Sequence, residues 1–366
     1  MRTSPFRRPR RQFAALLAAA LLVACGGETT TADPTSSTAA ASTSAAPTST
    51  EATTTTLATT TSEATTTTVP APVPVYPLTG LPVTDPAVAA RPAVVVKIDN
   101  NAKARPQSGL NSADIVFEEI VEVQTRFAAV FHSQGSDPVG PIRSGRTQDV
   151  DLLGSLNRPM FVWSGGNPGV TRVIENSDLR ELSALKSSAQ GAGFYRESSR
   201  SAPHNLYATT SGAWSLAPAD AGPPPQQFQY LAPGQAPVGE AGAACNGEMD
   251  GLRVEWRYDA AAGMYLRTNN GTPHNDLASG QINTNNVVVM FVNYQASQVD
   301  NRSPEAQTIG SGEVWVFTQG VLVRGTWSRA DRLSPITLSD SSGNPILLTP
   351  GRTWVELARN GSFNVG

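Results

Sequence analysis

The sequence contains little lysine, cysteine or histidine. Its 366 residues include 2 cysteines and 3 histidines, and its only lysines are Lys97, Lys103 and Lys186. Two cysteines are too few for a disulfide framework, and the histidines do not have the spacing of a zinc site. We therefore expect neither a disulfide-stabilised domain nor a metal or other cofactor.

Positive charge is scarce outside one short segment. The chain carries 27 basic and 30 acidic residues, for a net charge of -3. Five of the arginines lie in the first 24 residues, which hold no acid, so loss of that segment leaves 22 basic and 30 acidic residues and a net charge of -8. Nucleic-acid-binding proteins need a surplus of positive charge to contact phosphates. We therefore expect no nucleic-acid partner.

The first 24 residues have the pattern of an export signal. After a basic start comes an apolar run of about a dozen residues, too short for a membrane-spanning helix, which needs about 20. The run ends in Leu22-Val23-Ala24-Cys25-Gly26, the lipobox pattern of bacterial lipoproteins. We predict a signal peptide over residues 1–24 and acylation of Cys25 by chains such as palmitate, which anchors the protein to the outer face of the plasma membrane. Arg10-Arg11 also fits twin-arginine export, and that route and general secretion both remain open.

Residues 25–75 lack apolar bulk. From Glu28 to Val69, 19 of the 42 residues are Thr and six are Ser. Such a segment cannot bury enough surface to offset its chain entropy, so we predict a disordered tether between Cys25 and a folded part. Whether it is an O-glycosylated stalk or a passive linker stays open.

The folded part begins at Tyr76 and is expected to be an α+β structure. Residues 76–217 alternate strand-like and helix-like stretches and predict a mixed α/β domain. A Pro/Ala/Gly-rich interdomain loop follows at 218–248, and residues 249–366 predict a mostly antiparallel β domain. The expected helices are 145–156, 168–175 (with Asn167 as N-cap) and 177–186. The expected strands are 93–98, 115–123, 127–133 (after a turn at 124–126), 252–258, 264–267, 287–292, 313–317, 321–326, 346–348 and 353–357.

The strand expected at 115–123 carries carboxylates among apolar residues. Because side chains alternate between the two faces of a strand, Glu118 and Glu119 point in opposite directions, each beside apolar neighbours. A carboxylate on an apolar face is unfavourable unless it is paired. Two alternatives remain open: a carboxylate–guanidinium pocket for a polar ligand, and a structural salt-bridge network. The candidate partners nearby in sequence are Arg126, Arg143 and Arg146.

Two further stretches carry candidate binding residues. Gly140–Arg146 leads into an expected helix, where free N–H groups and two arginines favour an anion such as a phosphate, carboxylate or uronate. His204, followed by Asn205, and His274 lie in proline-bounded loops, where functional residues are common. A structural role for these histidines is the alternative.

Several short motifs occur in an order that resembles the YerB-like lipoproteins of Gram-positive bacteria, a family defined by a domain of unknown function. The resemblance covers roughly residues 76–357 and implies a surface lipoprotein with two apposed domains, without established catalytic residues. By this similarity the pocket candidates are Asp99, Asn100, Arg105, Glu118, Glu119, Arg126, Arg143 and His204. The motifs are Pro77-Leu78-Thr79-Gly80-Leu81, Val96–Asn100, Ala104–Leu110, Ala113–Val116, Thr125-Arg126-Phe127, Gly140–Ser144, Ala202–Tyr207, Asn286–Val289, Gly325-Thr326-Trp327 and Pro350–Trp354.

The leading hypothesis is a non-enzymatic envelope lipoprotein that binds a polar cell-wall or small-molecule ligand, or a protein partner, in a charged cleft. One alternative is a hydrolase or transferase of wall polymers, with Glu118 or Glu119 as the acid, Asp99 as a second carboxylate and His204 as a helper. The other alternative is a non-catalytic scaffold in which the charges form internal salt bridges.

Overall fold

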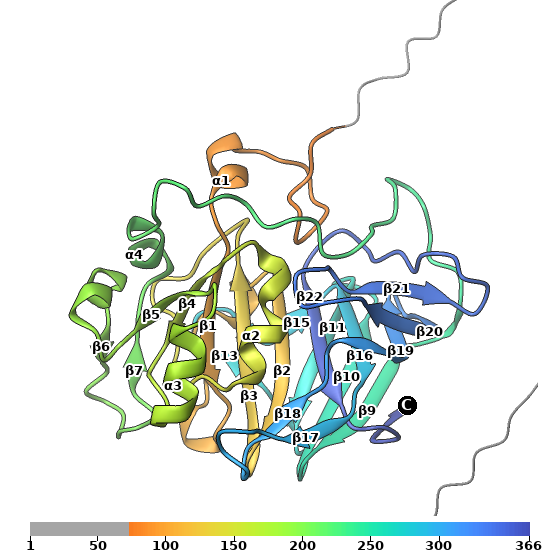
Figure 1. Ribbon diagram of the computed structural model, residues 1–366. Coiled ribbons are helices and arrows are strands. Elements are labelled where there is room, and N and C mark those ends of the chain that lie inside the picture. Colours follow the sequence, from red (N-terminus) through yellow and green to blue (C-terminus); the bar gives the residue numbers. More distant parts are fainter. Residues whose placement is uncertain (1–72) are drawn as a thin grey trace, which may run out of the picture. The chain divides into compact units, whose positions relative to one another are not determined.

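The computed structural model describes residues 73–366, and a large mixed sheet runs through them (Figure 1). The predicted signal peptide, Cys25 and nearly all of the predicted tether lie outside the described residues. The first half of the chain contributes five strands, of which the first three follow the predicted strands at 93–98, 115–123 and 127–133, whereas the other two were not predicted as strands. They are β1 (Val94–Asp99), β2 (Ile115–Val121), β3 (Gln124–Phe131), β4 (Met160–Trp163) and β5 (Arg180–Ser183).

The second half of the chain continues the same sheet. Its strands are β8 (Glu240–Ala241), β16 (Asn286–Phe291), β19 (Gly310–Thr318), β20 (Val321–Arg329), β21 (Thr337–Asp340) and β22 (Thr353–Ala358). The order across the sheet is β21-β20-β19-β16-β22-β2-β3-β1-β4-β5, with β8 against β20. β22 runs parallel to both β16 and β2, so it joins strands from the two halves of the sequence. The predicted N-terminal and C-terminal segments therefore share one sheet.

A smaller antiparallel sheet packs against one face of the large one. It contains β9 (Ala244–Met249), β10 (Leu252–Asp259), β11 (Met264–Asn269), β12 (Thr272–Pro273), β15 (Asn283–Thr284) and β23 (Phe363–Val365). Trp256 and Tyr265 of this sheet lie in one core with Val96 and Phe127 of the large sheet. Three two-stranded ribbons complete the β structure: β6 (Tyr195–Arg196) with β7 (Leu206–Tyr207), β13 (Asn275–Asp276) with β14 (Gly280–Gln281), and β17 (Tyr294–Ala296) with β18 (Pro304–Ala306).

Two short helices, α2 and α3, lie on the opposite face of the large sheet, across its central strands (Figure 1), whereas α4 packs into the core shared with the smaller sheet. α3 begins as predicted, since the Asn167 side chain accepts a hydrogen bond from Val170 N at 2.9 Å and Pro168 occupies the first turn. None of the helices within residues 73–366 has the length and apolar composition needed to cross a membrane. The α-helices are α1 (Pro86–Ala90), α2 (Gln148–Leu152), α3 (Pro168–Glu175) and α4 (Thr210–Ser215), and 3-10 turns occupy Ala102–Ala104, Leu110–Ser112, Gly154–Leu156 and Ser187–Ala192.

The α+β fold, with its strand-rich second half, is confirmed, whereas several local predictions are wrong. The helix expected at 177–186 is replaced by β5, because pairing with β4 supplies backbone partners that a short isolated helix lacks. The turn expected at 124–126 is wrong, because β3 already begins at Gln124 and the turn precedes that residue. The helix expected at 145–156 is shorter, since α2 covers only Gln148–Leu152. The strand expected at 346–348 does not form, and this stretch makes only an isolated bridge between Leu348 and Tyr230.

Candidate functional site

A row of charged side chains crosses the helix-covered face of the central strands. Asp99 on β1 pairs in register with Arg126 on β3, and Arg126 pairs in register with Glu119 on β2. Residues directly opposite one another on antiparallel strands point to the same face. The register therefore places three predicted candidates, which are widely spaced in the sequence, side by side on one face of the sheet.

Glu119 belongs to a buried ion-pair network. The Lys97 Nζ atom lies 2.6 Å from Glu119 Oε1 and 2.8 Å from Asp149 Oδ1, and all three side chains are fully buried. Gln148 Nε2 donates to the second Glu119 oxygen at 2.7 Å. Burial, followed by repulsion from Asp149, raises the pKa of Glu119 to about 7 against the opposing effect of Lys97. Lys97 was not among the predicted site residues, although a lysine inside an otherwise apolar strand is a signal for such pairing.

Arg126 is buried without a carboxylate partner among the described residues. Only 4% of the residue is exposed. Its Nη1 atom donates to Ser144 O at 2.9 Å, and its Nε atom has no hydrogen-bond partner in the described part of the chain. Burial, followed by the nearby positive charges of Arg146 and Arg143, lowers the pKa of Arg126 to about 10. The guanidinium is thus a buried positive charge flanked by like charges.

Two more arginines, from the stretch predicted to bind anions, surround Arg126. Arg146 Nε and Nη2 each donate to a Glu122 oxygen at 2.7 Å. Arg143 Nε lies 3.3 Å from Asp99 Oδ2, as an ion pair. We call Arg126, Arg143 and Arg146 the arginine cluster.

Asp99 holds His204 at the edge of the arginine cluster. The Nδ1 atom of His204 lies 2.6 Å from Asp99 Oδ2, and the Asp99 side chain is fully buried while 14% of the His204 side chain is exposed. The Asn205 side chain bonds to Glu197 O and Arg200 O within the same loop. Asn205 therefore braces the loop that carries His204.

A cavity of about 630 Å³ opens beside the arginine cluster. Ser144 and Arg146 line it together with Ser164–Asn167, the loop that connects β4 to α3. β1, β4 and β5 are parallel, and ligands of such sheets characteristically bind beyond the carboxyl ends of the strands. Glu122, Val123, Leu185, Asp300 and Arg302 complete the lining. The structure therefore brings Asp99, Arg126, Arg143, Arg146 and His204 together, and of these five residues Arg146 lines the cavity.

Glu118 points to the opposite face and belongs to a separate buried network. One of its oxygens accepts from Asn100 Nδ2 at 3.1 Å and Thr125 Oγ1 at 2.6 Å, and the other accepts from Arg267 Nη2. Glu356 lies opposite Glu118 on β22 and is also fully buried. Burial and repulsion from Glu118 raise the pKa of Glu356 well above its usual range. Sequence reasoning missed Arg267 and Glu356, because strand pairing across the sheet decides their position.

His274 and Arg105 extend this second network toward a smaller pocket. His274 Nδ1 lies 2.7 Å from Arg267 Nη1, and its Nε2 lies 2.8 Å from Gln107 Oε1. Burial and the charge of Arg267 lower the pKa of His274 well below its usual range. Arg105 Nε donates to Asn100 Oδ1 at 3.1 Å. Arg105 and His274 help to line a pocket of about 230 Å³ away from the arginine cluster.

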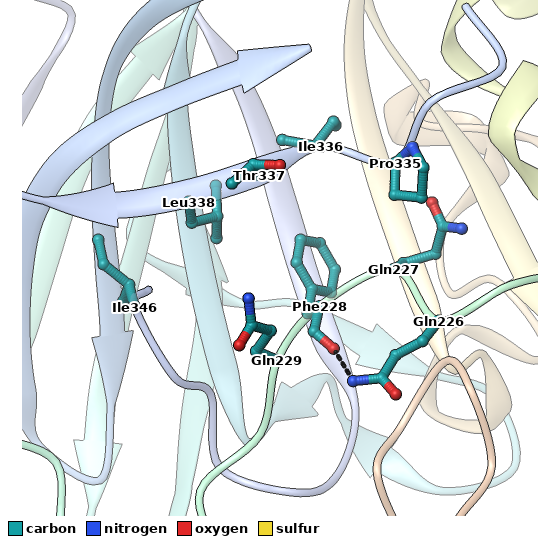
Figure 2. A pocket seen from close by; sticks show the side chains of 9 residues that line it. All are labelled: Gln226, Gln227, Phe228, Gln229, Pro335, Ile336, Thr337, Leu338 and Ile346. Carbon is teal, nitrogen blue, oxygen red and sulfur yellow. Dashed lines mark hydrogen bonds between the residues drawn. The ribbon is translucent and has the colours of Figure 1, made fainter. Parts of the chain in front are cut away.

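A third pocket, of about 250 Å³, carries none of the predicted residues. Figure 2 shows Phe228 with the apolar side chains of Ile336, Leu338 and Ile346 around it. Glutamines and a threonine supply its polar groups, and none of its lining side chains is charged. Its lining residues offer no acid, base or charge, so the arginine cluster is the stronger candidate site.

Comparison with known proteins covers both halves of the chain. Residues 78–222 match the family model described as "Protein of unknown function (DUF3048) N-terminal domain", and residues 247–355 match the corresponding C-terminal domain. Over 290 residues the chain is 30% identical to the protein named "Putative lipoprotein YerB" from Bacillus subtilis strain 168, a match covering 77% of this chain and 85% of that protein. The crystal structure of YerB protein from Bacillus subtilis superimposes with a TM-score of 0.69 at 26% identity, covering 80% of this chain and 99% of that one.

Proposed function

The chain belongs to the DUF3048 family, as its motifs predicted, and on that premise we propose that it is an extracytoplasmic lipoprotein that binds an anionic ligand at the arginine cluster. The lipobox at Cys25 and the name of the Bacillus subtilis relative support the anchoring. The ligand in this proposal is a phosphate- or carboxylate-bearing molecule outside the membrane, such as a segment of a cell-wall polymer.

The observation that carries the proposal is that Arg126 is buried without a carboxylate partner in the part of the chain that the structure describes. A buried charge is strongly unfavourable unless a counter-charge and hydrogen bonds compensate it. Arg126 has one backbone carbonyl partner and an orphan Nε atom, and its pKa is lowered by burial and by two neighbouring arginines. An orphan buried donor in a native protein calls for an explanation, and an anionic ligand supplies the missing acceptor and charge.

The surroundings of Arg126 support binding from the adjacent cavity. Ser144 accepts the Arg126 hydrogen bond and also lines the cavity of about 630 Å³. Guanidinium groups match the planar pairs of oxygens in carboxylates and phosphates. The paired-carboxylate hydrolase has less support, because Glu118 and Glu119 are fully buried, point to opposite faces and already have cationic partners.

Binding is tested with the full-length protein in detergent and with Arg126→Met, using inorganic phosphate and glucuronate as probes in calorimetry and urea unfolding. We expect a bound anion to stabilise the wild type by about 2.7 kcal/mol at a hundred times its Kd. Arg126→Met is expected to lose this effect. In anion-free buffer it should be as stable as the wild type or more so, since a buried unpaired charge has been removed.

The exposed Arg253 provides the matched control, because Arg253→Met removes the same charge far from the cluster and should bind like the wild type. If neither anion stabilises the wild type, or if Arg126→Met binds as well as the wild type, the proposed site is wrong. Anchoring is tested separately: Cys25→Ser should move the protein from the membrane fraction to the soluble fraction, and unchanged fractionation would contradict the lipid anchor.

A further inference from the structure

We propose that Asp99 and His204 make the arginine cluster a hydrolytic site for phosphodiesters, with His204 as the catalytic base. This inference rests on the proposed anion binding and adds a reaction to it. It differs from the paired-carboxylate mechanism expected from the sequence, because it uses Asp99 to orient a histidine and leaves Glu118 and Glu119 in their structural networks.

The geometry of the pair is that of a carboxylate-oriented histidine. Asp99 Oδ2 lies 2.6 Å from His204 Nδ1, so a proton on Nδ1 directs the lone pair of Nε2 away from the carboxylate. Asn101 N donates to Asp99 Oδ1 at 3.0 Å, and Arg143 approaches the Oδ2 atom at 3.3 Å. These contacts hold the buried carboxylate in place.

The free nitrogen of His204 is available to a ligand. Nε2 makes no hydrogen bond within residues 73–366 and is not among their buried unpartnered atoms. The loop carrying the histidine is fixed at several points, since the Arg200 guanidinium donates to Ala104 O at 2.8 Å and Pro106 O at 2.7 Å. A preorganised, partly exposed imidazole next to arginines is the arrangement required of a general base acting on an anion.

The proposed reaction consumes one water and needs no oxidant or reductant. His204 Nε2 removes a proton from water as the water oxygen forms a bond to phosphorus. The bond from phosphorus to one ester oxygen breaks, and the imidazolium returns the proton to the leaving alkoxide. A diester and water thereby become a monoester and an alcohol. Arg126 and Arg143 stabilise the charge that develops on the non-bridging oxygens.

The test uses the full-length protein in detergent with bis(4-nitrophenyl) phosphate, following release of 4-nitrophenolate. We expect His204→Gly to lower kcat about 10²–10⁴-fold, the usual contribution of a general base. Added imidazole should restore part of that loss, which a purely structural defect would not allow. Asp99 is a positioning residue, so Asp99→Asn should lower kcat more than it changes KM and move the acidic limb of the pH profile. Arg253→Met again serves as the control with wild-type rates.

The outcomes separate this inference from the proposed binding. Phosphate binding without diester hydrolysis, or hydrolysis unaffected by His204→Gly, would overturn the catalytic role and leave the binding site intact. Turnover of 4-nitrophenyl acetate alone would overturn the assignment to phosphodiesters. Absence of anion binding in the wild type would remove both proposals together.

Discussion

Replacing Lys97 by methionine removes the only cation from a fully buried group that contains Glu119 and Asp149. Methionine preserves the length and most of the volume of the lysine stem, so the substitution tests charge more than packing. Breaking a buried ion pair by deleting one partner lowers the free energy of unfolding by about 3–5 kcal/mol. That is a large part of the about 5–15 kcal/mol typical of a folded domain.

The loss in Lys97→Met is expected to depend on pH in a defined direction. In the wild type the pKa of Glu119 is already raised to about 7 by burial and by Asp149, and without Lys97 it rises further. A carboxyl whose folded pKa lies above its unfolded value destabilises the protein as the pH rises from the unfolded to the folded pKa. The slope is at most about 1.4 kcal/mol per pH unit for each such group. The free energy of unfolding of Lys97→Met should therefore fall further below that of the wild type at pH 8 than at pH 5.

The measurement is urea unfolding of both proteins at pH 5 and pH 8. Lys186→Met is the matched control, because Lys186 pairs with Glu175 and Glu181 but its side chain is 40% exposed, so the expected loss is about 0–1 kcal/mol. Adding Glu119→Gln to Lys97→Met should recover part of the loss by removing one unpaired carboxylate. A loss under about 1 kcal/mol at pH 8, or an equal loss at both pH values, would refute this account of the buried network.

The remaining predictions concern the second buried network and the start of α3. Glu356→Gln should change the free energy of unfolding by less than about 1 kcal/mol, because burial and repulsion from Glu118 raise the pKa of Glu356 and favour the neutral form, which glutamine resembles. Glu118→Gln should lower the free energy of unfolding by about 3–5 kcal/mol, because it leaves Arg267 without its hydrogen-bonded carboxylate. Equal decreases in the two variants would contradict these roles. Asn167→Ala should lower the free energy of unfolding, measured by heat or urea, by about 1 kcal/mol, because the N-cap hydrogen bond from Val170 N is missing. An unchanged free energy of unfolding would show that the cap contributes nothing.

Local features of the structure were predictable because short-range geometry determines them. The apolar run at 93–98 became β1, and Asn167-Pro168 started α3 as expected. The opposite orientations of Glu118 and Glu119 follow from the alternation of side chains along one strand, whatever the strand pairs with. The sequence also predicted the family, whereas the anion site at Gly140–Arg146 stays a prediction.

Contacts between distant segments were not predictable in the same way. The pairing of β22 with β2 places Glu356 beside Glu118, although 238 positions separate them in the sequence, and the fold of a loop brings His204 to Asp99. The alternation of side chains along a strand determines the face to which a side chain points, but strand order and register determine which residue it contacts. The sequence by itself determined that Glu118 and Glu119 lie on opposite faces of one strand, each beside apolar neighbours. Only the tertiary structure decided that Glu119 pairs with a lysine, that Glu118 pairs with an arginine and that Arg126 has no carboxylate partner within residues 73–366. Those partners come from strands and loops that the chain brings together only on folding.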